Sequence, residues 1–166
     1  MDNSKKWYAV YTKPRWEKKV HLLCGQQHIE SYCPLNKVRK KWSDRIKVVH
    51  EPLFKSYVFV HIAESEKTKV REVGGVLNYV YSEGRPAVIR EEEIDMIRKF
   101  LDEFEDVQAE PIDLKVDSRV TINKGALMNQ SGIVRRVLGN KVEVLIESMG
   151  YQLVAHISKS KLSSNN

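Results

Sequence analysis

The run Tyr57-Val58-Phe59-Val60-His61-Ile62 constrains the fold most, because it is the strongest strand signal in the chain. β-Branched and aromatic residues favour strands, and alternate residues of a strand point to opposite faces of the sheet. Val58, Val60 and Ile62 therefore form one apolar face, and Tyr57 and Phe59 lie on the other. A sheet built around this run needs cover on both sides.

Apolar spacing and turn residues predict the elements around this strand. The predicted strands are Trp7–Thr12, Ile29–Pro34, Val38–Trp42, Ile46–His50, Tyr57–Ile62 and Val76–Tyr81, and the predicted helices run from Pro14 to about His28, over Glu66–Val73 and from Glu91 to about Phe104. This order fits an α+β fold, an antiparallel sheet with helices mainly on one face.

The last third of the sequence changes character. Short Val-rich segments separated by glycines predict a small all-β barrel, with Gly139-Asn140 as a two-residue hairpin turn. Its predicted strands are Arg119–Asn123, Gly132–Leu138, Lys141–Ile146 and Tyr151–Ile157. The acidic, Pro111-containing stretch before them lacks a period. We therefore predict a domain at 1–104, a linker at 105–115 and a β-barrel domain at 116–166.

Charge is divided unevenly along the chain, which has a net charge of +6. Residues 1–62 have 13 Lys/Arg and 5 Asp/Glu, residues 63–114 have 7 and 14, and residues 115–166 have 8 and 3. A basic first third, an acidic middle and a basic end indicate separate surfaces for separate partners. A uniformly basic coat would have indicated a simpler polyanion binder.

Several functional classes find little support in the sequence. No apolar run approaches the ~20 residues of a membrane span, so we expect a cytoplasmic protein. The two cysteines predict thiols rather than a disulfide framework. His21, Cys24, His28 and Cys33 could be zinc ligands, but their spacing is unfamiliar and Cys24 belongs to an apolar helical stripe, which favours a buried thiol. Nucleotide-binding and hydrolase motifs are absent, so we expect no enzyme activity and no cofactor.

The aromatic side of the 57–62 strand suggests a protein interface. If Tyr57 and Phe59 face away from the helices, with Tyr8 or Tyr79 from neighbouring strands beside them, three rings would expose ~500 Å². Leaving them exposed would forgo on the order of 10 kcal/mol of burial. Either a partner or another part of the chain must cover them, and the second alternative is an ordinary two-sided core.

Basic residues gather at the start of the first helix and in the predicted hairpin. Lys13, Arg15, Lys18 and Lys19 lie near Trp16, and the hairpin has six Lys/Arg, together with Trp42, against a single acid, Asp44. Such residues could follow a phosphate backbone while the rings stack on bases. The alternative is a solvated charged face with both Trp in the core.

Several stretches together resemble the NusG family of transcription factors. They are Trp7-Tyr8-Ala9-Val10-Tyr11, Trp16-Glu17-Lys18-Lys19-Val20, the run Glu51–Val60, Gly75-Val76, Pro86, the helix with Ile94 and Ile97, and, for the family's KOW barrel, Asp117–Val120, Lys124–Leu127 and Gly132–Val134. Glu51–Phe54 and Trp42–Arg45 resemble specialised paralogues, RfaH and the UpxY-type antiterminators of capsular polysaccharide operons.

This resemblance implies a transcription elongation or antitermination factor that is operon-specific and acts as a monomer. It implies an apolar pocket for the clamp helices of the RNA polymerase β′ subunit, a basic surface for the non-template DNA strand, an approach of Lys67–Arg71 to the β-subunit gate loop, and a KOW domain that recruits the ribosome or Rho. The residues that match the pocket are Tyr8, Phe54, Tyr57, Phe59, Tyr79, Ile94 and Ile97. The nucleic-acid candidates are Lys13, Arg15, Lys19 and Arg71.

The sequence departs from the family in one KOW loop. Where the family has Gly-Pro-Phe and two further glycines, this chain has Gly125-Ala126-Leu127 and the single Gly132. This difference bears on the partners of that loop, Rho in particular. Two rival functions stay open at this point: a general housekeeping NusG factor, and a KOW-type RNA- or ribosome-binding protein that does not bind polymerase.

Overall fold

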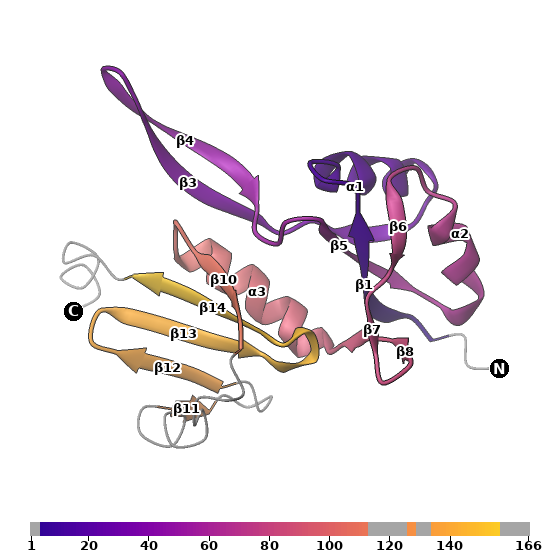
Figure 1. Ribbon diagram of the computed structural model, residues 1–166. Coiled ribbons are helices and arrows are strands. Elements are labelled where there is room, and N and C mark those ends of the chain that lie inside the picture. The colour runs from indigo at the N-terminus through magenta and orange to yellow at the C-terminus, as the bar shows by residue number, and fades with distance from the viewer. Residues whose placement is uncertain (1–3, 113–125, 129–133, 157–166) are drawn as a thin grey trace. The chain divides into compact units, whose positions relative to one another are not determined.

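The computed structural model describes residues 4–112, 126–128 and 134–156 of the chain. Two compact units divide it (Figure 1). The first unit comprises Met1–Leu35 and Pro52–Asp95, and the second comprises Asn36–Glu51 and Met96–Asn166. Within the described residues, no helix is long and apolar enough to span a membrane.

The first unit is built on an antiparallel sheet with β1 (Lys6–Thr12) at its centre. The order is β2-β5-β1-β6, and β9 also pairs with β1. The bounds of these partners are Glu30–Tyr32 for β2, Tyr57–Ile62 for β5, Val76–Tyr79 for β6 and Val88–Ile89 for β9. Two short strands, β7 (Tyr81–Ser82) and β8 (Arg85–Pro86), form a separate small hairpin.

Helices cover one face of this sheet. Helix α1 spans Glu17–Gln26, and a 3-10 turn, η1 (Glu64–Glu66), leads into α2 (Lys67–Arg71). Val20 and Cys24 of α1 and Val70 of α2 pack in one core with Val58 and Val60 of β5. The face of the 57–62 strand predicted to meet the helices is therefore confirmed.

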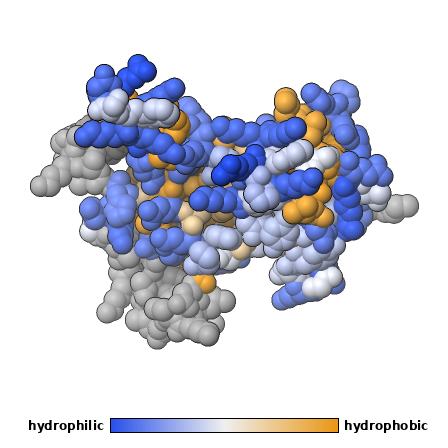
Figure 2. All heavy atoms as spheres, turned by 45° about the horizontal axis from the view of Figure 1, so that its top comes forward, coloured by the Kyte–Doolittle hydropathy of each residue, from blue (hydrophilic) through white to orange (hydrophobic). Residues whose placement is uncertain are grey.

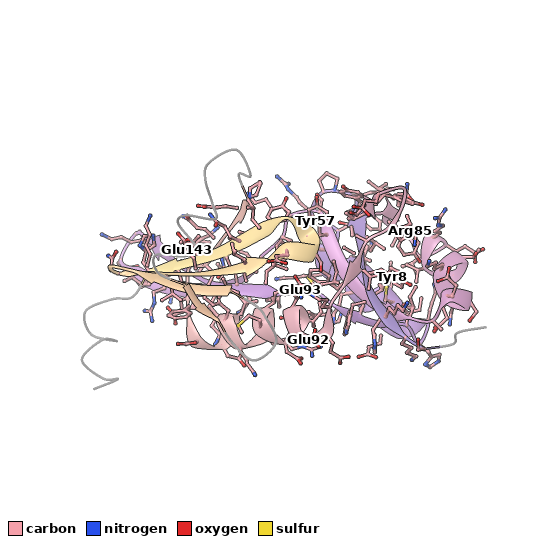
Figure 3. All side chains as sticks on the ribbon, turned by 90° about the horizontal axis from the view of Figure 1, so that it is seen from below. Tyr8, Tyr57, Arg85, Glu92, Glu93 and Glu143 are labelled. Carbon is pink, nitrogen blue, oxygen red and sulfur yellow. The ribbon has the colours of Figure 1, made fainter. Side chains whose placement is uncertain are left out.

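Helix α1 begins later than the sequence indicated. It starts at Glu17 rather than Pro14, because Arg15 has a φ of +68°, a left-handed conformation that a helix does not tolerate. The predicted third helix is confirmed as α3 (Glu91–Glu103). At its start, Glu93 is fully buried and accepts hydrogen bonds from the backbone N–H (3.0 Å) and Nε (3.1 Å) of Arg90. Figure 3 shows the neighbouring Glu92 on the outer side of α3.

The placement of two aromatic residues was predicted wrongly. Tyr8 pairs with Val60 across β1 and β5, and Tyr79 pairs with Val10 across β1 and β6. Residues directly opposite in an antiparallel sheet share a face. Tyr8 and Tyr79 therefore lie in the helix-covered core and not beside Tyr57 and Phe59.

The second unit contains a hairpin and a five-stranded sheet. The hairpin joins β3 (Leu35–Trp42) and β4 (Arg45–Pro52), as predicted around Ser43-Asp44. The sheet has the order β10-β14-β13-β12-β11. Its strands are β10 (Gln108–Pro111), β11 (Ala126–Met128), β12 (Val134–Leu138), β13 (Lys141–Ile146) and β14 (Tyr151–His156), with a 3-10 turn, η2 (Glu147–Met149), before the last.

This strand-rich region agrees with the predicted β-barrel domain. β12 and β13 pair as a hairpin around Gly139, whose φ of +61° suits the turn. Part of the predicted linker, however, is a strand: Gln108–Pro111 forms β10 and pairs with β14. The predicted strand at Arg119–Asn123 lies outside the described residues, and the domain boundaries stay a prediction.

Both cysteines are buried thiols, and this gives a testable pH dependence. Burial raises the pKa of Cys24 and of Cys33 from 9.0 to about 11. Because the folded pKa lies above the unfolded one, the contribution of each thiol to stability is complete below pH 9 and is lost between pH 9 and about 11. At pH 8 we expect Ellman's reagent to react about 100-fold more slowly with the native chain than with the denatured chain. Equal rates would contradict the burial of these thiols.

Candidate functional surface

One end of the central strand β1 brings together the two kinds of predicted functional residue. The backbone N–H of Thr12 donates to the carbonyl oxygen of Ser56 at 2.9 Å. The backbone N–H of Ser56, whose φ is +66°, donates at 2.9 Å to Oε2 of the buried Glu17. The start of α1, the end of β1 and the residue before Tyr57 are thus held in one place.

Lys13, Trp16 and Lys19 form a basic cluster at this end of β1. Nζ of Lys13 lies 5.1 Å from the centre of the Trp16 ring, and Nζ of Lys19 lies 4.1 Å from it. Both lysines are exposed and Trp16 is half-buried, so ammonium groups and part of a ring face solvent together. Two of the predicted nucleic-acid residues therefore meet around one ring, and we call Lys13, Trp16 and Lys19 the Trp16 cluster.

The Trp16 cluster depends on a glycine. The backbone N–H of Lys13 donates to the carbonyl oxygen of Gly75 at 2.9 Å, and Gly75 has a φ of +89°. A Cβ at Gly75 would lie 2.5 Å from Cε3 of Trp16 and 2.9 Å from Cγ2 of Val20. The Trp16 ring thus rests directly against the backbone at Gly75.

The other two nucleic-acid candidates have different surroundings. Arg15 is exposed in the turn before α1. Arg71, at the end of α2, donates from Nη2 to the hydroxyl of Tyr81 at 2.8 Å, and its guanidinium lies 5.2 Å from the centre of the Tyr79 ring. Arg71 therefore contacts Tyr79 and Tyr81 and is not part of the Trp16 cluster.

The residues matched to the polymerase pocket are largely buried. Within the described chain, Tyr8, Phe54, Phe59, Tyr79, Ile94 and Ile97 are all buried, and Phe59 is 0% exposed. Phe59 contacts the rings of Phe54 (centroids 5.7 Å apart) and Tyr32 (6.3 Å). Of the two alternatives, cover by the chain itself therefore holds for Phe59, whereas Tyr57 is only partly covered.

Tyr8 and Tyr79 have structural partners in the helix-covered core. Their rings meet edge to face at 6.0 Å, and the Tyr79 hydroxyl donates to the carbonyl oxygen of Lys67 at 2.8 Å. Burial raises the pKa of Tyr79 well above its usual value. These contacts attach α2 to the sheet.

Tyr57 is the one matched residue that is not buried. Its ring centre lies 5.0 Å from that of Tyr11, which is 38% exposed. Figure 3 shows Tyr8 and Tyr57 well apart in the first unit. The sequence reasoning missed Tyr11, although its pairing with Tyr57 follows from the antiparallel register of β1 and β5. Tyr11 and Tyr57 form an accessible tyrosine pair.

The zinc alternative gains no geometric support. Among the described residues, no group of three or more His, Cys, Asp or Glu is arranged to hold a metal. Cys24 and Cys33 are core residues, and Nδ1 of His21 is hydrogen-bonded to Oγ of Ser31 at 2.7 Å.

Comparison with known proteins identifies the family. The model of the family described as transcription termination factor nusG matches residues 5–98, more than half of the chain. The chain belongs to the NusG family. It is therefore a NusG-like transcription factor, from a family of regulators rather than enzymes.

Relatives match almost the whole chain. The transcription termination/antitermination protein NusG of Streptococcus pyogenes serotype M1 is 28% identical over 170 residues, with 92% of each chain covered. The protein of the same name from Chlamydia trachomatis serovar D is 24% identical over 163 residues, covering 87% of this chain and 86% of the relative. A solved structure described as "Domain interaction in Thermotoga maritima NusG" has a TM-score of 0.51 at 20% identity, covers 95% of this chain and 96% of that chain, and supports the fold.

Proposed function

We propose that this NusG-family protein is an elongation and antitermination factor that binds RNA polymerase and the non-template DNA strand and suppresses pausing and termination. The observation that carries the proposal is that the accessible tyrosine pair and the Trp16 cluster lie at the same end of β1. A protein surface and a nucleic-acid surface held in fixed geometry suit a factor that bridges polymerase and DNA.

The tyrosine pair is the proposed contact with the β′ clamp helices. Tyrosine is enriched at energetic hot spots, because it offers a large ring with a polar end. The buried residues Phe54 and Phe59 would support this surface from within the first unit, and Tyr8 and Tyr79 would support it from the opposite face of the sheet. Ile94 and Ile97 of α3 stay proposed polymerase-binding residues on the resemblance alone, since both are buried.

The Trp16 cluster and Arg15 are the proposed contact with the non-template strand. Ammonium groups neutralise phosphates and a partly exposed ring can stack on an unpaired base. Arg71 is a weaker DNA candidate, since it is hydrogen-bonded to Tyr81. The exposed residues Thr68, Lys69 and Arg71 are the proposed approach to the β-subunit gate loop.

Replacing Tyr11 and Tyr57 together with alanine tests the polymerase contact. We expect binding to purified core polymerase to weaken by at least about tenfold, since central aromatic contacts often contribute 2 kcal/mol or more. Leu22→Ala is the control, because Leu22 is 61% exposed on α1 of the same unit and lies outside the proposed contact. Binding is measured by biolayer interferometry, with circular dichroism to verify the fold. If the unaltered protein does not bind purified core polymerase, the proposal is wrong.

We further propose that the factor serves particular operons, of the capsular polysaccharide type, and acts as a monomer whose KOW domain recruits the ribosome. The support is the similarity of Glu51–Phe54 and Trp42–Arg45 to specialised paralogues and the altered loop at Gly125-Ala126-Leu127. A general housekeeping role is the second candidate, favoured by relatives named for termination and antitermination that match over 92% and 87% of this chain. A binding assay with purified Rho separates the two roles, because the specialised role predicts weak or no binding to Rho.

A further inference from the structure

The tip of the β3–β4 hairpin is an exposed ribbon whose composition the proposed function does not explain. Every residue from 39 to 48 is exposed. Trp42 is 56% exposed and Ile46 is 63% exposed. Figure 1 shows β3 and β4 as a long twisted ribbon, and Figure 2 shows its tip, at the upper left, as mainly hydrophilic with paler and apolar side chains among the charged ones. The Trp42 ring at this tip is therefore accessible for stacking, with cations beside it.

The base of the hairpin, in contrast, is firmly attached within its own unit. The side chain of Asn36 donates to the carbonyl oxygen of Val107 at 2.7 Å and accepts from its backbone N–H at 3.0 Å. The backbone N–H of Asp106 donates to the carbonyl oxygen of Lys37 at 2.8 Å. A two-stranded ribbon alone is marginally stable, so this attachment holds the tip ready for binding.

Positive charge accumulates on both faces of the tip. Nζ of Lys47 lies 5.9 Å from the centre of the Trp42 ring, which places Trp42 and Lys47 on one face, together with Arg45 by strand alternation. Lys41 faces the other way, as the neighbour of Trp42 in β3. Asp44 is the only acid between residues 37 and 50. The two ion pairs of the hairpin, Arg39 with Glu105 and Lys40 with Glu51, involve residues nearer the base than Lys41.

We propose that this tip binds a single-stranded nucleic acid through stacking on Trp42 and phosphate contacts from Lys41, Arg45 and Lys47. An exposed indole stacks on an unpaired base, whereas the bases of a duplex are already stacked on each other. Cations on both faces of a narrow ribbon can follow a flexible backbone that passes around it. This site belongs to the second unit, shares no residue with the Trp16 cluster and needs no polymerase.

The test uses the purified full-length chain and three fluorescein-labelled probes: a 20-nucleotide RNA, the DNA strand of the same sequence and the DNA duplex. Fluorescence anisotropy gives the dissociation constant of each. Trp42→Ala is expected to weaken single-strand binding about tenfold. Trp42→Phe keeps a ring, so its dissociation constant is expected to stay within about threefold of that of the unaltered chain. The triple variant K41Q/R45Q/K47Q is expected to bind at least about tenfold more weakly and to lower the salt slope by about 2.

A charge-matched control separates the site from general electrostatic attraction. The triple variant K5Q/R85Q/K99Q removes the same number of positive charges from exposed positions that are not part of the hairpin, and we expect binding within about twofold of the unaltered chain. Weaker binding of either single-stranded probe by the hairpin variants supports the proposal. Comparison of the RNA and DNA probes shows whether the 2′-hydroxyl contributes. Unchanged binding by the hairpin variants, an equal loss in the control, or a preference for the duplex would overturn it. Thermal melts verify that each variant folds.

Discussion

Replacing Gly75 with alanine is expected to destabilise the first unit by about 2–5 kcal/mol, the combined cost of a strained positive φ and an overpacked contact. The backbone at Gly75 has a φ of +89°, and an added Cβ would lie 2.5 Å from the Trp16 ring. The same Cβ would also lie 2.9 Å from Cγ2 of Val20, which is fully buried. The variant should therefore lose stability and disturb the Trp16 cluster together.

Gly74→Ala is the matched control for this prediction. A Cβ at Gly74 would meet only Cδ1 of Leu23, at 3.6 Å, which is ordinary van der Waals contact. We expect this variant to stay within about 1 kcal/mol of the unaltered chain, since the smaller unfolded-state entropy of alanine can even stabilise it. Urea unfolding followed by circular dichroism compares the two midpoints. Equal midpoints would show that the Trp16 ring does not rest on Gly75.

The second large effect is expected at Asn36, the buried amide at the base of the hairpin. Asn36→Leu removes both hydrogen bonds to Val107 and leaves a buried N–H and a buried carbonyl oxygen without that partner. Each unsatisfied group costs about 1–3 kcal/mol, so we expect a loss of about 2–6 kcal/mol from the second unit. The hairpin should also be held less firmly, with the hydrogen bond from Asp106 to Lys37 remaining, and hydrogen exchange at β3 would detect this as faster exchange.

A neighbouring ion pair supplies the comparison. Arg39 and Glu105 are joined through Nε and Oε2 at 2.6 Å, and this pairing raises the pKa of Arg39. Arg39 is exposed, so solvent screens the pair, and Arg39→Ala is expected to shift the urea midpoint far less than Asn36→Leu. A similar shift of the urea midpoint for both variants would mean that the Asn36 amide contributes no more to stability than an exposed ion pair.

Local sequence patterns were enough to predict most of the elements. The alternation in Tyr57–Ile62, the Ser43-Asp44 turn and the Gly139-Asn140 turn each predicted an element that the structure contains. The start of α1 was misplaced because proline at 14 favours a helix start, whereas Arg15 has a φ of +68° and α1 begins only at Glu17. β10 was missed for a related reason. Gln108–Pro111 has no strand periodicity and is a strand because β14 offers it hydrogen bonds.

The candidate surface was less accessible to sequence reasoning. The alternation within one strand shows which of its own residues share a face of the sheet. Which residues of the adjacent strands lie on that face depends on the register between the strands. Tyr8 and Tyr79 were therefore assigned to the wrong face, and Tyr11, the neighbour of Tyr57, was not considered. The Trp16 cluster was partly foreseen because Lys13, Trp16 and Lys19 are close in sequence. The role of Gly75 could be recognised only from the three-dimensional structure, since Gly75 is far from Trp16 in the sequence.

The pairing of β10 with β14 has a practical consequence for dissecting the protein. Backbone groups of Gln108–Pro111 pair along Tyr151–Val154. A C-terminal fragment that begins at residue 116 would omit β10 and leave one side of β14 with unsatisfied donors and acceptors, an open edge that invites aggregation. A fragment meant for isolated study should therefore start before Gln108, so that it includes β10 together with its partner β14.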